Sequence, residues 1–217
     1  MTESRNINIS ISKDQLAELP IVYYSGQISV IDTIDTAKSA IHFINNQSIV
    51  GFDTETRPSF RKGKSNNVSL VQISTLNHSF LFRINKLGFI DELKSLLENP
   101  NITKIGLSLK DDFNVLHKIT QFTPQGFIEL QSFVKKYKIT DCSLQKIYAI
   151  IFNERISKSQ RLSNWEANIL SPSQQNYASI DAWACLRIYK YLLEGNFLPQ
   201  KSKYCHTEKI SSETIPN

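Results

Sequence analysis

The chain has 217 residues and a formal net charge of +5, with 41% hydrophobic and 21% charged residues. These values are close to those of ordinary soluble proteins, and the length favours one domain with a real core over two small ones. No run in the sequence approaches the roughly 20 apolar residues of a membrane span, which argues against a membrane protein. The polar N-terminus also lacks the apolar stretch of a signal peptide.

Cysteine and histidine residues are scattered along the chain. The three cysteines, Cys142, Cys185 and Cys205, show no paired ligand spacing, so we expect reduced thiols in a cytoplasmic protein. The four histidines are equally dispersed, which argues against a zinc site. The excess of positive charge favours a polyanionic partner, although a basic protein need not have one.

The first half of the chain predicts strands around one helix. Residues 21–31 predict a strand or a hairpin edge, and residues 33–47 carry apolar positions at helical spacing. Three strand-like segments follow, at residues 49–54, 68–74 and 79–84. Their links are short, so we expect an antiparallel meander.

Strands and helices then alternate. Residues 89–99 predict an amphipathic helix, and residues 102–109 predict a strand. Residues 111–119 predict a helix whose first turn is acidic, as its dipole favours. A last strand is expected at residues 126–130, and a helix at residues 143–152.

The final helix has the clearest boundaries. Ser171 can serve as N-cap, Pro172 fits the first helical position, and Gln174 is a capping-box partner. Gly195 suits the C-terminal cap. Strands that come first and then alternate with helices predict an α/β sandwich around a mixed sheet.

We expect one folded domain over residues 21–196. Residues 1–20 are polar, and this N-terminal segment is predicted to be partly ordered at best. Residues 197–217 are predicted to form a flexible polar tail.

Two carboxylates end the first strand of the meander. Asp53 and Glu55 follow an apolar run, and side chains two apart in a strand share one face. Like charges so placed repel each other, and partial burial adds to the cost. The pair therefore predicts a positive group between the two side chains, although a solvated strand end is also compatible with the pattern.

Two further acids and a tyrosine are unusually placed. Asp112 lies at a strand-to-helix junction, and Asp181 lies within an apolar stretch of the final helix. Tyr177 precedes Asp181 by one helical turn, on the same face. Each residue taken alone is also compatible with a position that has no catalytic function, either on the solvated surface or in ordinary packing. Together the four acids suit Mg²⁺ or a similar hard cation, and several carboxylates from different elements can form a two-metal phosphoryl-transfer site.

Three segments resemble the motifs of the DEDD-type 3′–5′ exonucleases. They are FDTE from residue 52, GLSLKDDFNVL from residue 106 and YASIDAWACLRIY from residue 177. The tyrosine four residues before the last aspartate resembles the tyrosine (DEDDy) subclass, which includes ribonuclease D and the exonuclease domain of the Werner syndrome protein. RLSNW at residues 161–165 is similar to the Werner-type branch. The resemblance covers residues 21–195 and implies a ribonuclease H-like fold.

The resemblance also implies a role for each residue. Two divalent ions, Mg²⁺ or Mn²⁺, would be bridged by Asp53. Glu55 and Asp181 would complete the ion that activates the attacking water, and Glu55 could also orient that water. Asp112 would hold the second ion on the leaving-group side, partly through water. Tyr177 would hydrogen-bond the water or the scissile phosphate.

Asp111 and Asp112 are adjacent, so it is ambiguous which of them is the acid of the second motif. The family pattern places it six residues after the strand glycine and four before an apolar helix residue. Counting from Gly106 and to Leu116 selects Asp112 and leaves Asp111 as a charge at the helix N-terminus. Other acids, such as Glu129 and Asp141, are interpreted as non-catalytic.

Two basic segments flank these acids. We expect them to contact phosphates without base preference, while an ordinary solvated loop is the alternative for the first. An aromatic residue in the first segment could stack on the terminal nucleotide. The predicted nucleic-acid contacts are Arg57, Phe60, Arg61, Lys62, Lys64, Lys158 and Arg161. Trp165, just after the second segment, is predicted to serve packing.

The sequence therefore predicts a metal-dependent exonuclease that acts on nucleic acid with a free 3′ end, with DNA favoured over RNA. A ribonuclease D-like exoribonuclease is the closest alternative, because discrimination between DNA and RNA depends on how the site treats a 2′-hydroxyl. An inactive nucleic-acid-binding domain, or a structural domain with surface acids, are the alternatives from other classes.

Overall fold

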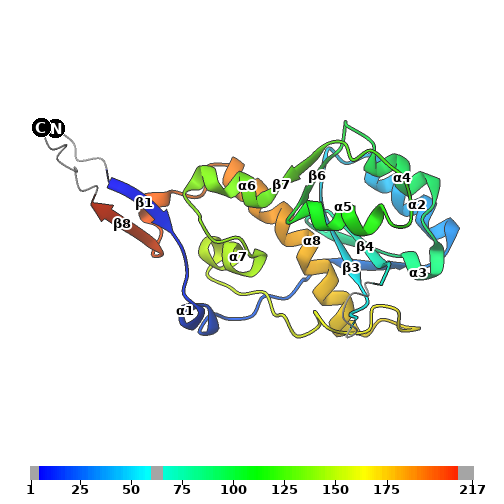
Figure 1. Cartoon of the computed structure of the whole chain (residues 1–217), viewed down its shortest axis with the longest axis horizontal. Coiled ribbons are helices and arrows are strands. Elements are labelled where there is room, and N and C mark those ends of the chain that lie inside the picture. Colours follow the sequence, from blue (N-terminus) through cyan, green and yellow to red (C-terminus); the bar gives the residue numbers. More distant parts are fainter. Residues whose placement is uncertain (1–4, 60–65, 210–217) are drawn as a thin grey trace, which may run out of the picture.

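The computed structural model describes residues 5–59 and 66–209. Its main sheet has six strands in the order β2-β5-β4-β3-β6-β7, and β4 alone among them runs antiparallel to its neighbours (Figure 1). The strands are β2 (Gln27–Ile31), β3 (Ile49–Thr56), β4 (Val68–Ser74), β5 (His78–Arg83), β6 (Thr103–Gly106) and β7 (Phe127–Glu129). The predicted meander of β3, β4 and β5 is confirmed, as is the mixed sheet.

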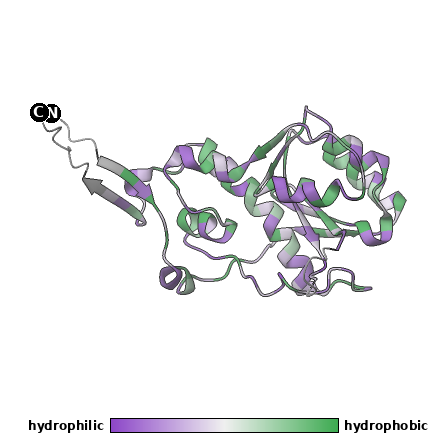
Figure 2. Ribbon diagram, viewed as in Figure 1, coloured by the Kyte–Doolittle hydropathy of each residue, from purple (hydrophilic) through white to green (hydrophobic). Residues whose placement is uncertain are grey.

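Helices cover both faces of the sheet. Apolar side chains of α2, α4 and α5 form one core with the strands, and those of α7 and α8 form a second. Most helices show both purple and green in Figure 2, as expected when one face is buried. The bounds are α1 (Lys13–Ala17), α2 (Ile34–Asn45), α3 (Ile84–Leu87), α4 (Asp91–Leu97), α5 (Leu109–Leu116), α6 (Leu130–Val134), α7 (Leu144–Phe152) and α8 (Pro172–Leu193). In the described part of the chain, no helix combines the length and apolarity needed to cross a membrane.

Strand β3 separates the two cores. Phe52 packs into the core under α2, α4 and α5. The other face of β3 is turned toward α8. On it lie Gly51, which has no side chain, and the side chains of Asp53 and Glu55. An ideal Cβ built on Gly51 would lie 1.8 Å from the carbonyl oxygen of Ala182, so the α8 backbone touches the sheet at this glycine.

The predicted ends of α8 are confirmed. Ser171 and Gln174 form the capping box, Pro172 occupies the first turn, and Gly195 follows the helix with a φ of 74°. The helix crosses the sheet diagonally in Figure 1, and its middle lies over β3 and β4.

The two ends of the described chain differ from the prediction. Strand β1 (Arg5–Ile9) pairs antiparallel with β8 (Cys205–Lys209), and Figure 1 shows this ribbon projecting at the end of the molecule away from α2 and α4. A short 3₁₀ helix, η2 (Pro199–Lys201), precedes β8, and another, η1 (Lys135–Tyr137), follows α6. Segments that look polar and irregular one at a time can form strands when a partner some 200 residues away supplies the hydrogen bonds. Ile9 anchors the ribbon because it is fully buried.

We expect Gly51→Ala to destabilise the protein, because the added methyl group requires α8 to move off β3. Overpacking of this kind costs about 1–3 kcal/mol in the free energy of unfolding. Urea denaturation followed by circular dichroism measures it. Ser39→Ala on the exposed face of α2 is the control and should change stability by less than about 0.5 kcal/mol. An unchanged urea midpoint for Gly51→Ala would contradict the close approach.

Candidate active site

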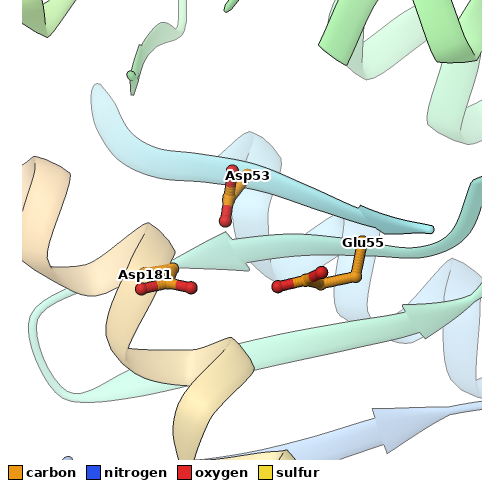
Figure 3. Close-up of side chains that lie close together, drawn as sticks. All are labelled: Asp53, Glu55 and Asp181. Atoms are coloured by element: carbon orange, nitrogen blue, oxygen red, sulfur yellow. The ribbon is translucent and has the colours of Figure 1, made fainter. Parts of the chain in front are cut away.

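Three carboxylates converge where β3 faces α8. Asp53 and Glu55 come from β3 and Asp181 from the middle of α8, and one oxygen from each lies within 4.8 Å of the others. Figure 3 shows the three side chains pointing into a shared space. The sequence predicted this convergence of strand and helix, and the structure brings these three residues together.

The close approach at Gly51 positions this group. Asp53 follows Gly51 by two residues on the same face of β3, and Asp181 directly precedes Ala182, whose carbonyl touches Gly51. A side chain at position 51 would separate the two elements and with them the carboxylates. The geometry of the site is therefore fixed by backbone packing.

Burial and mutual repulsion raise the pKa values of these three acids. Burial raises the pKa of Asp53 well above its usual range, and the charge of Asp181 adds to the rise. Burial raises the pKa of Glu55 to about 10, with further contributions from Asp53 and Asp181 and an opposing one from Arg161. Burial also raises the pKa of Asp181 to about 7, although a hydrogen bond with Tyr177 and the charge of Lys158 oppose it.

Such a group suits divalent cations. Partly buried carboxylates that repel one another are stabilised when a cation lies among them, and oxygen ligands are those that Mg²⁺ and Mn²⁺ prefer. The donor set of Asp53, Glu55 and Asp181 consists of carboxylate oxygens only. These residues therefore fit the metal dependence of a phosphoryl-transfer site.

Asp112 lies beside this group of three rather than within it. Its carboxylate is buried and accepts a 2.5 Å hydrogen bond from the Thr54 hydroxyl, on the opposite face of β3 from Asp53. Burial raises the pKa of Asp112 to about 8, and the charge of Asp53 contributes. Asp111 is exposed. Asp112, which the motif spacing selects, is thus the buried member of the adjacent pair, and its role in the site stays a prediction.

Tyr177 borders the carboxylates from one turn earlier in α8. Burial is the main cause that raises its pKa, and the charge of Asp181 is the next. The Trp165 ring lies 5.9 Å from the Tyr177 ring and is fully buried, which agrees with its predicted role in packing. The Trp165 ring therefore restricts the Tyr177 ring on one side.

A cavity of about 510 Å³ opens over the carboxylates. Lys158 and Arg161 line it and are exposed, so the second basic segment lies beside the acids. The start of α7 and Gln131 also contribute to the wall. The sequence offered no signal for these neutral residues, because they become neighbours of the acids only through the fold. The lining residues are Asp53, Glu55, Leu107, Ser108, Gln131, Cys142, Ser143, Leu144, Gln145, Ile156, Ser157, Lys158, Arg161, Tyr177, Asp181 and Cys185.

The first basic segment is only partly described. The Arg57 guanidinium forms an ion pair with Glu166 at 3.1 Å, which ties the end of β3 to the segment that carries Trp165. The predicted contacts Phe60, Arg61, Lys62 and Lys64 lie outside the described residues. A phosphate role for Arg57 stays a prediction.

The remaining acids have structural partners. Glu129 accepts hydrogen bonds from the backbone N–H groups of Ser108 and Leu109 at the start of α5, which is a capping role. Asp141 pairs with Lys146 at 2.7 Å and accepts from the N–H of Ile11. Their interpretation as non-catalytic is compatible with these contacts.

Comparisons with known proteins agree with this geometry. The family model described as 3′-5′ exonuclease matches residues 28–195. The mouse protein named bifunctional 3′-5′ exonuclease/ATP-dependent helicase WRN is 32% identical over 155 residues, which are 69% of this chain and 11% of that protein. DNA polymerase I of Aquifex aeolicus is 27% identical over 145 residues, which are 66% of this chain and 23% of the polymerase.

Solved structures show the same fold. Escherichia coli RNase D, described as an exoribonuclease involved in structured RNA processing, matches with a TM-score of 0.70 at 22% identity, over 77% of this chain and 44% of that chain. The expected ribonuclease H-like architecture is thus confirmed. Because the family model covers most of the residues and the motif acids converge, this chain belongs to the DEDD-type 3′–5′ exonuclease family.

Proposed function

We propose that this chain hydrolyses phosphodiester bonds at the 3′ ends of nucleic acids, with the help of two divalent ions, Mg²⁺ or Mn²⁺. The observation that carries the proposal is the convergence of Asp53, Glu55 and Asp181 within 4.8 Å, in a cavity that also holds Tyr177. The chain spans 11% and 23% of the lengths of the two relatives above, so its own activity has to be tested directly.

The four acids would hold the ions. Asp53, Glu55 and Asp181 form the central set, and Asp112 lies next to it behind Thr54. When bound, the ions neutralise the phosphate and assist both the attacking and the leaving oxygen of an in-line displacement. Ion binding also removes the repulsion among the acids, which favours their ionised form.

Neutral and basic side chains would orient the substrate. The Tyr177 hydroxyl can donate a hydrogen bond to the attacking water or to a phosphate oxygen, because a phenol stays protonated at neutral pH. Glu55 can accept a hydrogen bond from the same water. Lys158 and Arg161 at the cavity wall can pair with phosphates of the strand, which gives affinity without sequence preference.

We propose DNA as the preferred substrate and RNA as the second candidate. A relative named DNA polymerase I shares 27% identity with this chain, which favours DNA. The structural neighbour named as an exoribonuclease is 22% identical and supports the fold alone. The partner in either case is a strand with a free 3′ end.

We expect the protein to shorten 5′-labelled single-stranded DNA from the 3′ end in Mg²⁺ or Mn²⁺, and RNA of the same sequence more slowly. Asp53→Asn should lower the rate by about 10³-fold, because charge stabilisation by a bound ion contributes several kcal/mol. Denaturing gels of the products over time measure both. EDTA should abolish the ladder. Binding without cleavage under every ion would instead support the inactive nucleic-acid-binding domain.

Asp112 and Asp111 form a matched pair for a second test. Asp112→Asn should lower the rate by about 10²-fold, because an amide at this buried position next to Asp53 cannot ionise to hold a divalent ion. Asp111→Asn should leave the rate unchanged, because the side chain is exposed. Equal losses in the two variants would contradict the assignment. Circular dichroism at 25 °C would show that both variants are folded.

We expect metal-induced stabilisation to grow with pH. The pKa values of about 7 for Asp181 and about 8 for Asp112 exceed the ordinary value of 3.8, so the folded state keeps protons that the unfolded chain releases above pH 4. Between about pH 4 and 8 the metal-free protein therefore loses stability as pH rises, by up to about 1.4 kcal/mol per pH unit for each such proton. Divalent ions compete with those protons, so they bind better at high pH.

Thermal unfolding at pH 6, 7 and 8, in EDTA and in Mg²⁺, measures this effect. The increase in Tm on adding Mg²⁺ should be larger at each higher pH. An Asp53→Asn/Asp181→Asn variant is the control and should lose most of that dependence. An Mg²⁺ effect of the same size at all three pH values would contradict the expectation.

A further inference from the structure

A buried amide lies in the wall between the sheet and α8. Gln72 of β4 is fully buried, and neither its Nε2 nor its Oε1 has a hydrogen-bond partner among the described residues. An unsatisfied buried polar group costs about 1–3 kcal/mol, and folded proteins keep few of them. An apolar side chain of the same size would avoid this cost, so the presence of an amide here calls for a reason.

The strand register places Gln72 directly beside Asp53. The two residues are paired across β3 and β4, so their side chains share one face and their Cβ atoms lie about 4.5–5.5 Å apart. The cross-strand partner on the other side is Leu81 of β5, which has no polar side-chain atom. Two residues further along β4, on the same face, the Ser74 hydroxyl already donates to Ser79 at 2.8 Å. The Asp53 carboxylate is therefore the polar group that the sheet offers to Gln72.

We propose that Gln72 is a positioning residue for Asp53: when the carboxylate is ionised and holds divalent ions, the amide Nε2–H donates a hydrogen bond to one of its oxygens. The inference rests on the proposed function. A donor of this kind fixes the orientation of a ligating carboxylate, which is a common role of residues just outside a metal site. A neutral amide suits the position better than lysine or arginine, because a cation there would compete with the ions.

Gln72→Met separates this role from simple packing. Methionine has a similar length and no strong donor, so a packing role alone predicts a protein of equal or greater stability with unchanged metal binding. A positioning role predicts that Mn²⁺ affinity falls by about 10-fold or more while the Tm in EDTA is kept or raised. Titration calorimetry with Mn²⁺ on the full chain and thermal unfolding in EDTA give the two readouts. Gln72→Leu repeats the test with a different shape.

Tyr24→Phe is the matched control. Its hydroxyl is also buried and without a hydrogen-bond partner among the described residues, but it packs beside Trp183 and burial alone raises its pKa, with no carboxylate involved. Removal of this hydroxyl should leave Mn²⁺ affinity unchanged.

The outcomes are distinct. Weaker Mn²⁺ binding in both Gln72 variants, with wild-type binding in Tyr24→Phe, supports the inference. Wild-type affinity for Mn²⁺ in either folded Gln72 variant overturns the inference and leaves Gln72 a packing residue. Loss of the fold in both Gln72 variants overturns it as well. An equal loss of Mn²⁺ affinity in Tyr24→Phe also overturns it. A wild-type protein that binds no Mn²⁺ overturns the inference together with the proposed metal site. Cleavage of DNA by the wild-type protein tells these failures apart.

Discussion

The contact between the backbone of α8 and strand β3 is the constraint on which the site depends. Because Gly51 has no Cβ atom, the Ala182 carbonyl can approach the sheet closely, and the Cβ atom of any other residue at this position would clash with it. Asp181 is the neighbour of Ala182, and Asp53 shares the face of Gly51. The geometry of the carboxylate group is therefore set by rigid backbone elements, which hold side chains more accurately than loops do.

The same contact creates an electrostatic problem. Three partly buried carboxylates within 4.8 Å of one another destabilise the folded chain, and their raised pKa values reflect this cost. Neighbouring groups offset part of it. Lys158 and Arg161 contribute positive charge from the exposed wall, and Tyr177 contributes a hydrogen bond. The remaining imbalance is what a bound divalent ion would relieve, so affinity for metal and instability without metal have one physical origin.

Much of the fold could be predicted because local patterns and tertiary environment agree. Strand β4 is buried on both faces in the middle of the sheet, and α8 has caps at both ends. The ribbon of β1 and β8 could not be predicted, because its two strands pair with each other across nearly the whole chain. Helix α6 was missed for a related reason. It is five residues long, and its cap is Glu129, which also binds the first turn of α5.

The sequence by itself indicated the family through the resemblance of three short motifs, and it singled out four acids and a tyrosine, because each motif lies within one local element. Only the tertiary structure decided how these elements meet. It showed that Asp53, Glu55 and Asp181 form one group while Asp112 is bound to Thr54 beside it, and that Arg57 is paired with Glu166. It also placed the buried Gln72 opposite Asp53. Strand register and helix packing bring together residues far apart in the chain, and no local pattern encodes the distance between their side chains.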